Sequence, residues 1–170
     1  MRALKLFLPV VAACLLAGCA GYHLGPVNGA LPGARSVEVL PFNNQTFQPR
    51  LGDALTQALR QHLQADGTYH LATSGPGEVI VSGVIRSYDR EALGFLNTDV
   101  TTVENYRIGM MVHVTVRERA SGKLLLDKDV KGHTLLNVGS DLASSERQAM
   151  PTLADDVAQN ITELLTEGTW

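Results

Sequence analysis

The chain has 170 residues, of which 45% are hydrophobic, and its formal net charge is −3 at pH 7. This length suits a single domain that buries roughly two-thirds of the surface of the unfolded chain. A slightly acidic chain lacks the basic surface that nucleic-acid binding requires, which excludes nucleic acid as an expected partner. Only two cysteines occur, Cys14 and Cys19, and both belong to the N-terminal segment.

The N-terminus has the pattern of a bacterial secretion signal. Arg2 and Lys5 precede an apolar run over residues 6–16, and small residues follow it. The run is shorter than the roughly 18 apolar residues that cross a bilayer, so an uncleaved membrane anchor is the weaker alternative. The segment Leu16-Ala17-Gly18-Cys19 resembles the lipobox of bacterial lipoproteins. We therefore predict a signal peptide over residues 1–18 and a lipid on the thiol of Cys19.

Lipidation would decide where the mature chain acts. Removing Arg2 and Lys5 from the 14 basic residues leaves 12 against 17 acidic ones, a net charge of about −5. Acyl chains, at about 0.8 kcal/mol per buried CH₂, hold such a domain on a membrane without help from its surface charge. Ala20 stands where an aspartate signals inner-membrane retention in many proteobacteria, so the lipobox resemblance implies the outer membrane, on its periplasmic side. With Cys14 removed and Cys19 capped by lipid, no thiol remains for disulfide or redox chemistry.

Residues 19–34 are rich in glycine and proline and predict a lipidated tether. Pro26 and Pro32 would interrupt any helix in this stretch. The domain itself is then expected over residues 35–170.

The first half of the domain predicts two strands around a helix. A strand is expected over Ser36–Phe42, followed by a polar turn. From Pro49 to Asp66, apolar residues recur at three- and four-residue steps, which predicts an amphipathic helix with one apolar face. A minor strand around Tyr69–Ala72 is a further possibility. Glu78–Tyr88 is apolar on both faces, which predicts a central strand parallel to the first through a right-handed crossover.

The second half predicts a hairpin and a closing helix. Turn residues and polar residues over 89–103 indicate a long loop. Tyr106–Arg117 alternates clearly between apolar and polar residues, and a turn joins it to an antiparallel partner over Leu124–Leu136. A polar loop is expected over Asn137–Ser145.

The last helix has an ambiguous start. Ser145 and Gln148 have the spacing of a capping box, but Pro151 would remove a hydrogen bond from the second turn. The helix is therefore either kinked at Pro151 or begins near it. From Leu153 the apolar stripe is regular, and Gly168 ends it.

This order predicts an α+β fold of the two-layer sandwich type. Two helices with one apolar face each would cover one side of a mixed, mainly antiparallel four-stranded sheet, in the order β-α-β-β-β-α. The far side is more apolar than a face that meets only water. Its residues would be Met111 and either Ile80 or Val84, among Arg86, Arg107, His113 and Thr115. Two interpretations remain open: scattered surface hydrophobics, or a face that binds a partner.

The sequence lacks the motifs of a secreted enzyme. It contains no G-x-S-x-G, S-x-x-K, H-E-x-x-H or Walker loop, so we predict no catalytic residues, no metal and no cofactor. His62 lies on the apolar stripe of the first helix and is interpreted as a packed residue. His113 and His133 lie on adjacent predicted strands, and a metal site between them is the weaker alternative.

Several weak motifs follow one another along the whole mature chain. They are Cys19-Ala20-Gly21-Tyr22-His23-Leu24, Leu31-Pro32, residues 37–44, Pro49-Arg50-Leu51, residues 55–59, Tyr106-Arg107, Ser121-Gly122-Lys123 and residues 161–165. In their order and spacing they resemble LptE, the family of lipopolysaccharide-assembly lipoproteins.

The resemblance implies a non-catalytic protein with two helices and four strands. It implies a lipoprotein that sits inside LptD, the outer-membrane β-barrel through which lipopolysaccharide reaches the cell surface, and helps it to fold. It also implies contact with lipopolysaccharide, whose lipid A phosphates require cations. Arg86, Arg90 and Arg107 are the candidates for that contact. The alternative for each arginine is a solvated charge at a strand end, and the expected loop over residues 137–145 contains no Lys or Arg.

A second hypothesis comes from a different class of protein. A lipoprotein that regulates a periplasmic enzyme, such as a peptidoglycan synthase, can use a similar small α/β domain. An enzyme is the third hypothesis, and it requires His113 and His133 to converge in a cleft with a carboxylate.

Overall fold

The structure is a computed structural model that describes residues 35–96, 99–138 and 141–167. The predicted signal peptide, the lipidation site Cys19 and the tether therefore lie outside the described residues. The elements in chain order are β1 (Arg35–Val39), β2 (Asn43–Asn44), α2 (Leu51–Asp66), β3 (Tyr69–Leu71), β4 (Val79–Leu96), β5 (Asp99–Glu118), β6 (Leu124–Asn137) and α3 (Leu142–Glu167).

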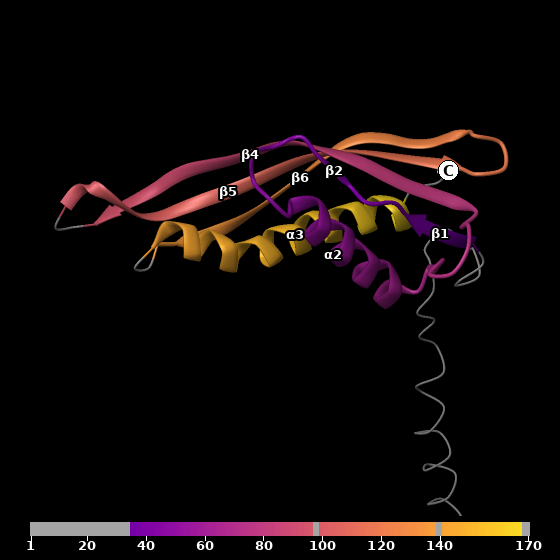
Figure 1. Ribbon diagram of the computed structural model, residues 1–170, viewed down its shortest axis with the longest axis horizontal. Coiled ribbons are helices and arrows are strands. Elements are labelled where there is room, and N and C mark those ends of the chain that lie inside the picture. Colours follow the sequence, from indigo (N-terminus) through magenta and orange to yellow (C-terminus); the bar gives the residue numbers. More distant parts are fainter. Residues whose placement is uncertain (1–34, 97–98, 139–140, 168–170) are drawn as a thin grey trace, which may run out of the picture.

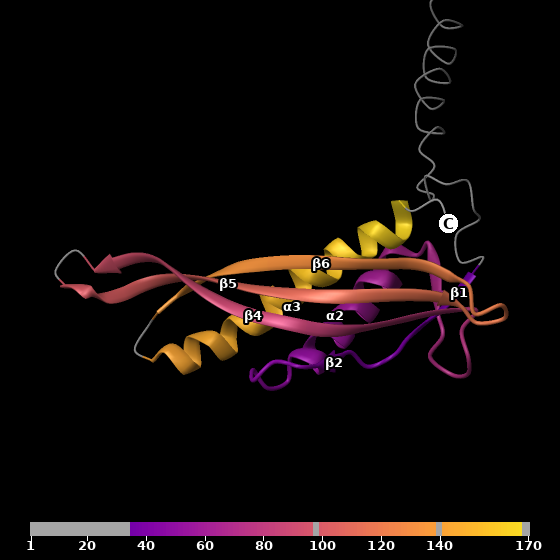
Figure 2. The same ribbon diagram turned by 90° about the horizontal axis from the view of Figure 1, so that it is seen from above.

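The sheet and the two helices form two layers (Figure 1). Both helices lie on one face of the sheet, and no described helix covers the opposite face (Figures 1 and 2). The sheet is mixed, because β1 runs parallel to β3 and β4 while β4, β5 and β6 are antiparallel neighbours. The predicted α+β two-layer sandwich is confirmed, and its sheet is open.

Two short strands extend the four that the sequence predicted. The strand order is β3-β1-β4-β5-β6, with β2 attached to β4 beside this path. The expected minor strand is present as β3, which pairs with β1. β2 falls in the expected polar turn and pairs with Val84 and Ile85. The predicted parallel pairing of β1 with the central strand β4 is confirmed.

The core lies between the helices and one face of the sheet. Alternate residues of β5 from Ile108 to Val116 are at most 2% exposed, which confirms the predicted alternation. The helices contribute buried side chains from one stripe each, among them Leu55, Leu59, Leu63, Leu153, Val157 and Ile161. Burying a large apolar side chain contributes about 1.5–3 kcal/mol, so this layer contact holds the helices on the sheet.

The prediction of a long loop over residues 89–103 is wrong. β4 continues to Leu96 and β5 begins at Asp99, and the two strands stay paired along this stretch. Register shifts between Ile85 and Ser87 and around Gly94 absorb the residues that break the alternation, so polar residues remain in the ladder. The resulting hairpin reaches beyond the helix layer (Figures 1 and 2).

The start of the last helix also differs from the prediction. α3 begins at Leu142 and continues through Pro151 to Glu167, so neither the loop to Ser145 nor a start near Pro151 is correct. The Asp141 carboxylate caps the helix, because it accepts hydrogen bonds from the N–H groups of Ala143 (3.3 Å) and Ser144 (2.9 Å). Neither described helix has the length and hydropathy that a membrane span requires.

Candidate docking face of the sheet

The uncovered side of the sheet is called the outer face. It consists of the residues that alternate with the core residues of β4, β5 and β6. In the middle of the sheet these are Ile80, Ser82, Val84, Arg86, Met111, His113, Thr115, Asp127, Asp129 and Lys131. Cross-strand pairing arranges them in rows, since Thr115 lies between Ser82 and Asp127 and His113 lies between Val84 and Asp129.

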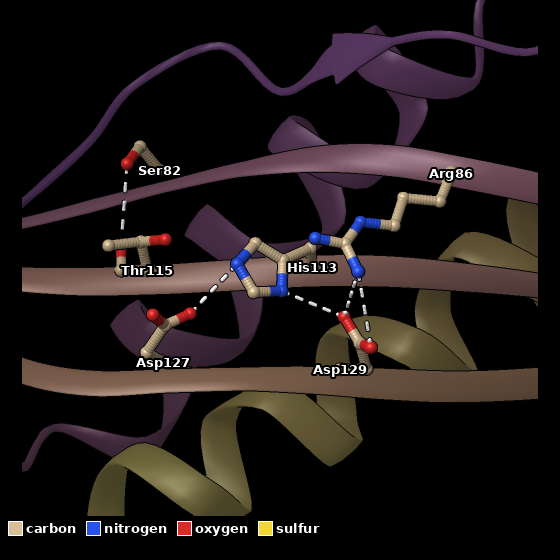
Figure 3. A network of polar contacts seen from close by, with 6 residues as sticks. All are labelled: Ser82, Arg86, His113, Thr115, Asp127 and Asp129. Carbon is tan, nitrogen blue, oxygen red and sulfur yellow. Dashed lines mark hydrogen bonds and ion pairs between the residues drawn. The ribbon is translucent and has the colours of Figure 1, made fainter.

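His113 is the centre of a polar network on this face (Figure 3). Its Nε2 lies 2.8 Å from an oxygen of Asp127, and its Nδ1 lies 2.8 Å from an oxygen of Asp129. Asp129 also accepts a hydrogen bond of 3.1 Å from Nη1 of Arg86. The two ring nitrogens therefore each face a carboxylate of β6. The network thus joins β4, β5 and β6 across the outer face.

The network holds no paired nucleophile. The Ser82 hydroxyl donates to the carbonyl oxygen of Thr115 at 3.5 Å and does not contact the His113 ring (Figure 3). His133 pairs with Gly109 rather than standing opposite His113. In the described ranges no group of three or more His, Cys, Asp or Glu residues is arranged to hold a metal ion. His62, interpreted as a packed residue, is half-buried and contacts Asp155 of α3 at 2.7 Å.

The three arginines predicted for lipopolysaccharide contact are not brought together. Arg86 pairs with Asp129 (3.1 Å) and Arg107 pairs with Glu91 (3.1 Å) on the outer side. Arg90 instead reaches Glu146 of α3, at 3.0 Å. Each guanidinium already has a carboxylate partner, so none of the three is an unpaired cation that could bind a phosphate without losing that partner.

Glu146 connects the helix layer to the projecting hairpin. The hydroxyl of Tyr88 donates to the Glu146 carboxylate at 3.1 Å, beside the ion pair with Arg90. Burial raises the pKa of the Tyr88 hydroxyl, and the negative charge of Glu146 raises it further, so the phenol stays protonated and keeps donating.

A cleft of about 610 Å³ opens beside these residues. β4 lines it with Arg86, Ser87, Tyr88 and Arg90, α3 lines it with Glu146, and residues 45–48 form the remaining wall. Phe47 in that wall is fully exposed. Sequence reasoning did not single out Phe47, which directly follows the expected polar turn, or Glu146, which directly follows the expected polar loop over residues 137–145. An aromatic residue next to a polar turn was the available signal.

Solved structures with the same architecture include several bacterial lipoproteins. The chain is 14% identical to the protein CT253 from Chlamydia trachomatis, with a TM-score of 0.56 and coverage of 81% of this chain and 97% of that one. A minor lipoprotein from Acinetobacter baumannii is 17% identical, with a TM-score of 0.51 and coverage of 77% of this chain and 91% of that one. Lipoprotein B from Nitrosomonas europaea is 12% identical, with a TM-score of 0.54 and coverage of 86% of this chain and 90% of that one. Such low identities show the fold alone, that of a two-layer α/β domain which bacterial lipoproteins use.

Comparison of the sequence with models of protein families identifies the family of this chain. Residues 34–165 match the model of the lipopolysaccharide-assembly family LptE, which covers nearly all of the described domain. The chain belongs to the LptE family, which is non-catalytic. Among curated proteins, comparison by sequence found no match.

Proposed function

We propose that this protein is an outer-membrane lipoprotein that sits inside an LptD-type β-barrel and assists its assembly into the translocon that delivers lipopolysaccharide to the cell surface. The observation that carries the proposal is the family match over residues 34–165. The uncovered outer face supports it, because a sheet with helices on one side only leaves a broad surface for a partner (Figure 2).

The chemistry of the outer face suits the inside of a barrel. The lumen wall of an outer-membrane barrel is polar, whereas its lipid-facing side is apolar. The outer face mixes the partly buried Ile80, Val84 and Met111 with charged groups that are already paired with one another. Covering these ion pairs costs hydration free energy, and a polar wall can replace part of that hydration with hydrogen bonds whereas hydrocarbon cannot, so this face matches a lumen better than lipid.

The predicted anchor is compatible with this position. A lipid on Cys19 would hold the chain at the membrane, and β1 begins at Arg35. The intervening tether over residues 19–34 spans at most about 55 Å when fully extended. The anchored domain could therefore reach well into a barrel from the periplasmic side.

Contact with lipopolysaccharide through Arg86, Arg90 and Arg107 is the finer part of the proposal. A lipid A phosphate would have to replace Asp129, Glu146 or Glu91 as the partner of a guanidinium. Binding of lipopolysaccharide to the purified protein should fall several-fold in Arg86→Glu and Arg107→Glu, and not in the exposed control Lys123→Glu. Equal binding by all three variants would remove these arginines from the proposal.

The partner is tested by cross-linking in intact outer membranes. A tagged copy, extracted in detergent, should bring down a large outer-membrane β-barrel. Recovery of the lipoprotein alone would contradict the proposal. Recovery of an inner-membrane peptidoglycan synthase instead would support the alternative, a regulator of a periplasmic enzyme.

A further inference from the structure

We propose that the cleft beside Phe47 docks an extended segment of the barrel partner, which adds to the free edge of β4 and packs on Phe47. The inference rests on the proposed function, since it takes the barrel to be the partner. It assigns a specific site to a contact that the family match leaves unspecified.

Phe47 is presented to solvent by a fixed loop. Its exposed fraction is 108%, so its ring packs against nothing in the described chain. The Asn44 side chain organises the loop: its Oδ1 accepts from the N–H (3.0 Å) and hydroxyl (2.8 Å) of Thr46, and its Nδ2 donates to the Gln48 carbonyl (2.7 Å). An aromatic side chain on a preorganised loop binds a partner without the entropy cost of ordering that loop.

Both ends of the loop are tied to the fold. Before it, the N–H of Gln45 donates to the carbonyl oxygen of Ile85 in β4 at 3.1 Å. After it, Arg50 adopts a left-handed conformation, with φ of 64°, and α2 starts at once. Gly52 in the first turn lies against the chain before the loop, because a Cβ there would stand 2.5 Å from the Phe42 carbonyl oxygen. The position of Phe47 is therefore set by the sheet and by α2 together.

β4 has an unpaired edge next to this loop. β2 covers it only at Val84 and Ile85, and no described strand pairs with that edge from Ser87 to Leu96. In a β-ladder, alternate residues direct their N–H and C=O groups to the two sides. The stretch Ser87–Glu91, about 17 Å long at 3.3 Å per residue, therefore offers main-chain groups to a further strand. The cleft lies along this stretch, where such a strand would run.

The charges around the cleft favour a polypeptide over an anionic lipid. Arg86 and Arg90 are already paired, and the carboxylate of Glu146 itself lines the cleft. A phosphate would meet this carboxylate at close range. Phe47 is also a single aromatic residue in a polar loop, whereas binding to a bilayer surface needs a wide apolar face. A main-chain edge with one apolar anchor is the arrangement by which sheets take up extended peptides.

The same edge resists indiscriminate pairing. The register shift between Ile85 and Ser87 twists the strand at this edge. The Glu146 carboxylate also lines the cleft. A segment that docks here must fit the twisted edge, tolerate this charge and supply an apolar side chain for Phe47, so selective binding of one partner is expected.

The test compares Phe47→Ser with Leu124→Ser in the full-length lipoprotein co-expressed with its barrel. Leu124 is another exposed hydrophobic residue, 42% exposed, at the far end of the sheet. Phe47→Ser should reduce the co-purified barrel about tenfold or more, and Leu124→Ser should leave it unchanged. Because the Phe47 ring is fully exposed, Phe47→Ser should keep the melting temperature of the wild type.

Hydrogen exchange on the wild-type protein gives an independent readout. Amides of Ser87–Glu91 that face away from β5 should exchange at least tenfold more slowly in the barrel complex than in the free lipoprotein. Unchanged exchange, together with normal barrel recovery by Phe47→Ser, would overturn this inference and leave the proposed function standing. Slowing by lipopolysaccharide micelles alone would overturn the polypeptide as occupant. Failure of the wild type to recover any barrel would overturn the proposed function itself.

Discussion

Gly132 of β6 marks a point of very close approach between the two layers. A Cβ at this position would lie 2.5 Å from Cγ2 and 3.0 Å from the backbone nitrogen of Val157 in α3. We predict that Gly132→Ala lowers the free energy of unfolding by about 1–3 kcal/mol, because the helix must move away from the sheet. The control is Gly94→Ala, whose Cβ would approach Asn105 only to 3.6 Å. Equal urea midpoints for the two variants would contradict the close approach.

Tyr69 gives the fold an alkaline pH dependence. Its hydroxyl donates to the carbonyl oxygen of Leu165 at 2.8 Å, and burial raises its pKa to about 12 from an ordinary value of 10.0. Because the unfolded chain loses this proton first, the stabilisation is complete below pH 10 and is lost as the pH rises towards 12. Tyr69→Phe should cost about 1 kcal/mol at pH 7. The difference from wild type should shrink between pH 10 and 12 in urea titrations. A difference that stays constant over this range would show that the hydroxyl is not buried.

Cys19 is tested through processing. Cys19→Ala should leave a precursor of full size that takes up no radiolabelled palmitate, because the thiol that accepts the lipid is gone. Cys14→Ala, in the expected signal peptide, should be processed and labelled normally. Mature-sized, labelled protein from Cys19→Ala would show that the lipid is attached elsewhere.

At the scale of elements, Glu146 holds the first turns of α3 to β4. Glu146 is only 9% exposed. Its carboxylate accepts a hydrogen bond from the Tyr88 hydroxyl and forms an ion pair with the Arg90 guanidinium. Glu146→Ala should lower the free energy of unfolding by about 1–2 kcal/mol, since the half-buried phenol of Tyr88 loses its acceptor. Amides in the first two turns of α3 should exchange faster than those after Leu153. Uniform exchange along α3 would mean that Glu146 does not anchor this end.

The elements with strong periodicity could be predicted from the sequence. α2 and β5 follow their apolar patterns closely, because each buries one face against a single layer. The segment 89–103 misled the prediction, since bulges keep a strand paired where its alternation fails. The start of α3 was missed for another reason. Asp141 caps the helix, and tertiary contacts at Glu146 and Leu153, on either side of Pro151, hold it in one piece.

The candidate site was less accessible to sequence reasoning than the fold. Strand alternation correctly placed Met111, His113 and Thr115 on the outer face, away from the core. The partners Asp127 and Asp129 depend on the register of the β5–β6 hairpin, which the turn residues alone did not fix. Phe47 and the free edge of β4 depend on where β2 stops, and a two-residue strand leaves no periodic signal.

At the scale of the whole molecule, one layer of helices leaves one face of the sheet for a partner. The helices cannot also cover the outer face, because each has a single apolar stripe, and that stripe is buried in the core. The molecule is therefore asymmetric, with a closed helical side and an open sheet side (Figure 1). The proposed function therefore depends on what the open side meets.

Photo-cross-linking from the outer face tests this contact most directly. A photoreactive residue would replace Lys131 on the outer face and, for comparison, Gln61 on the exposed side of α2, in the full-length protein in intact outer membranes. Lys131 should form an adduct with a large β-barrel in several-fold greater yield than Gln61. Adducts from Gln61 alone, or barrel recovery with no adduct from the outer face, would contradict docking through the sheet.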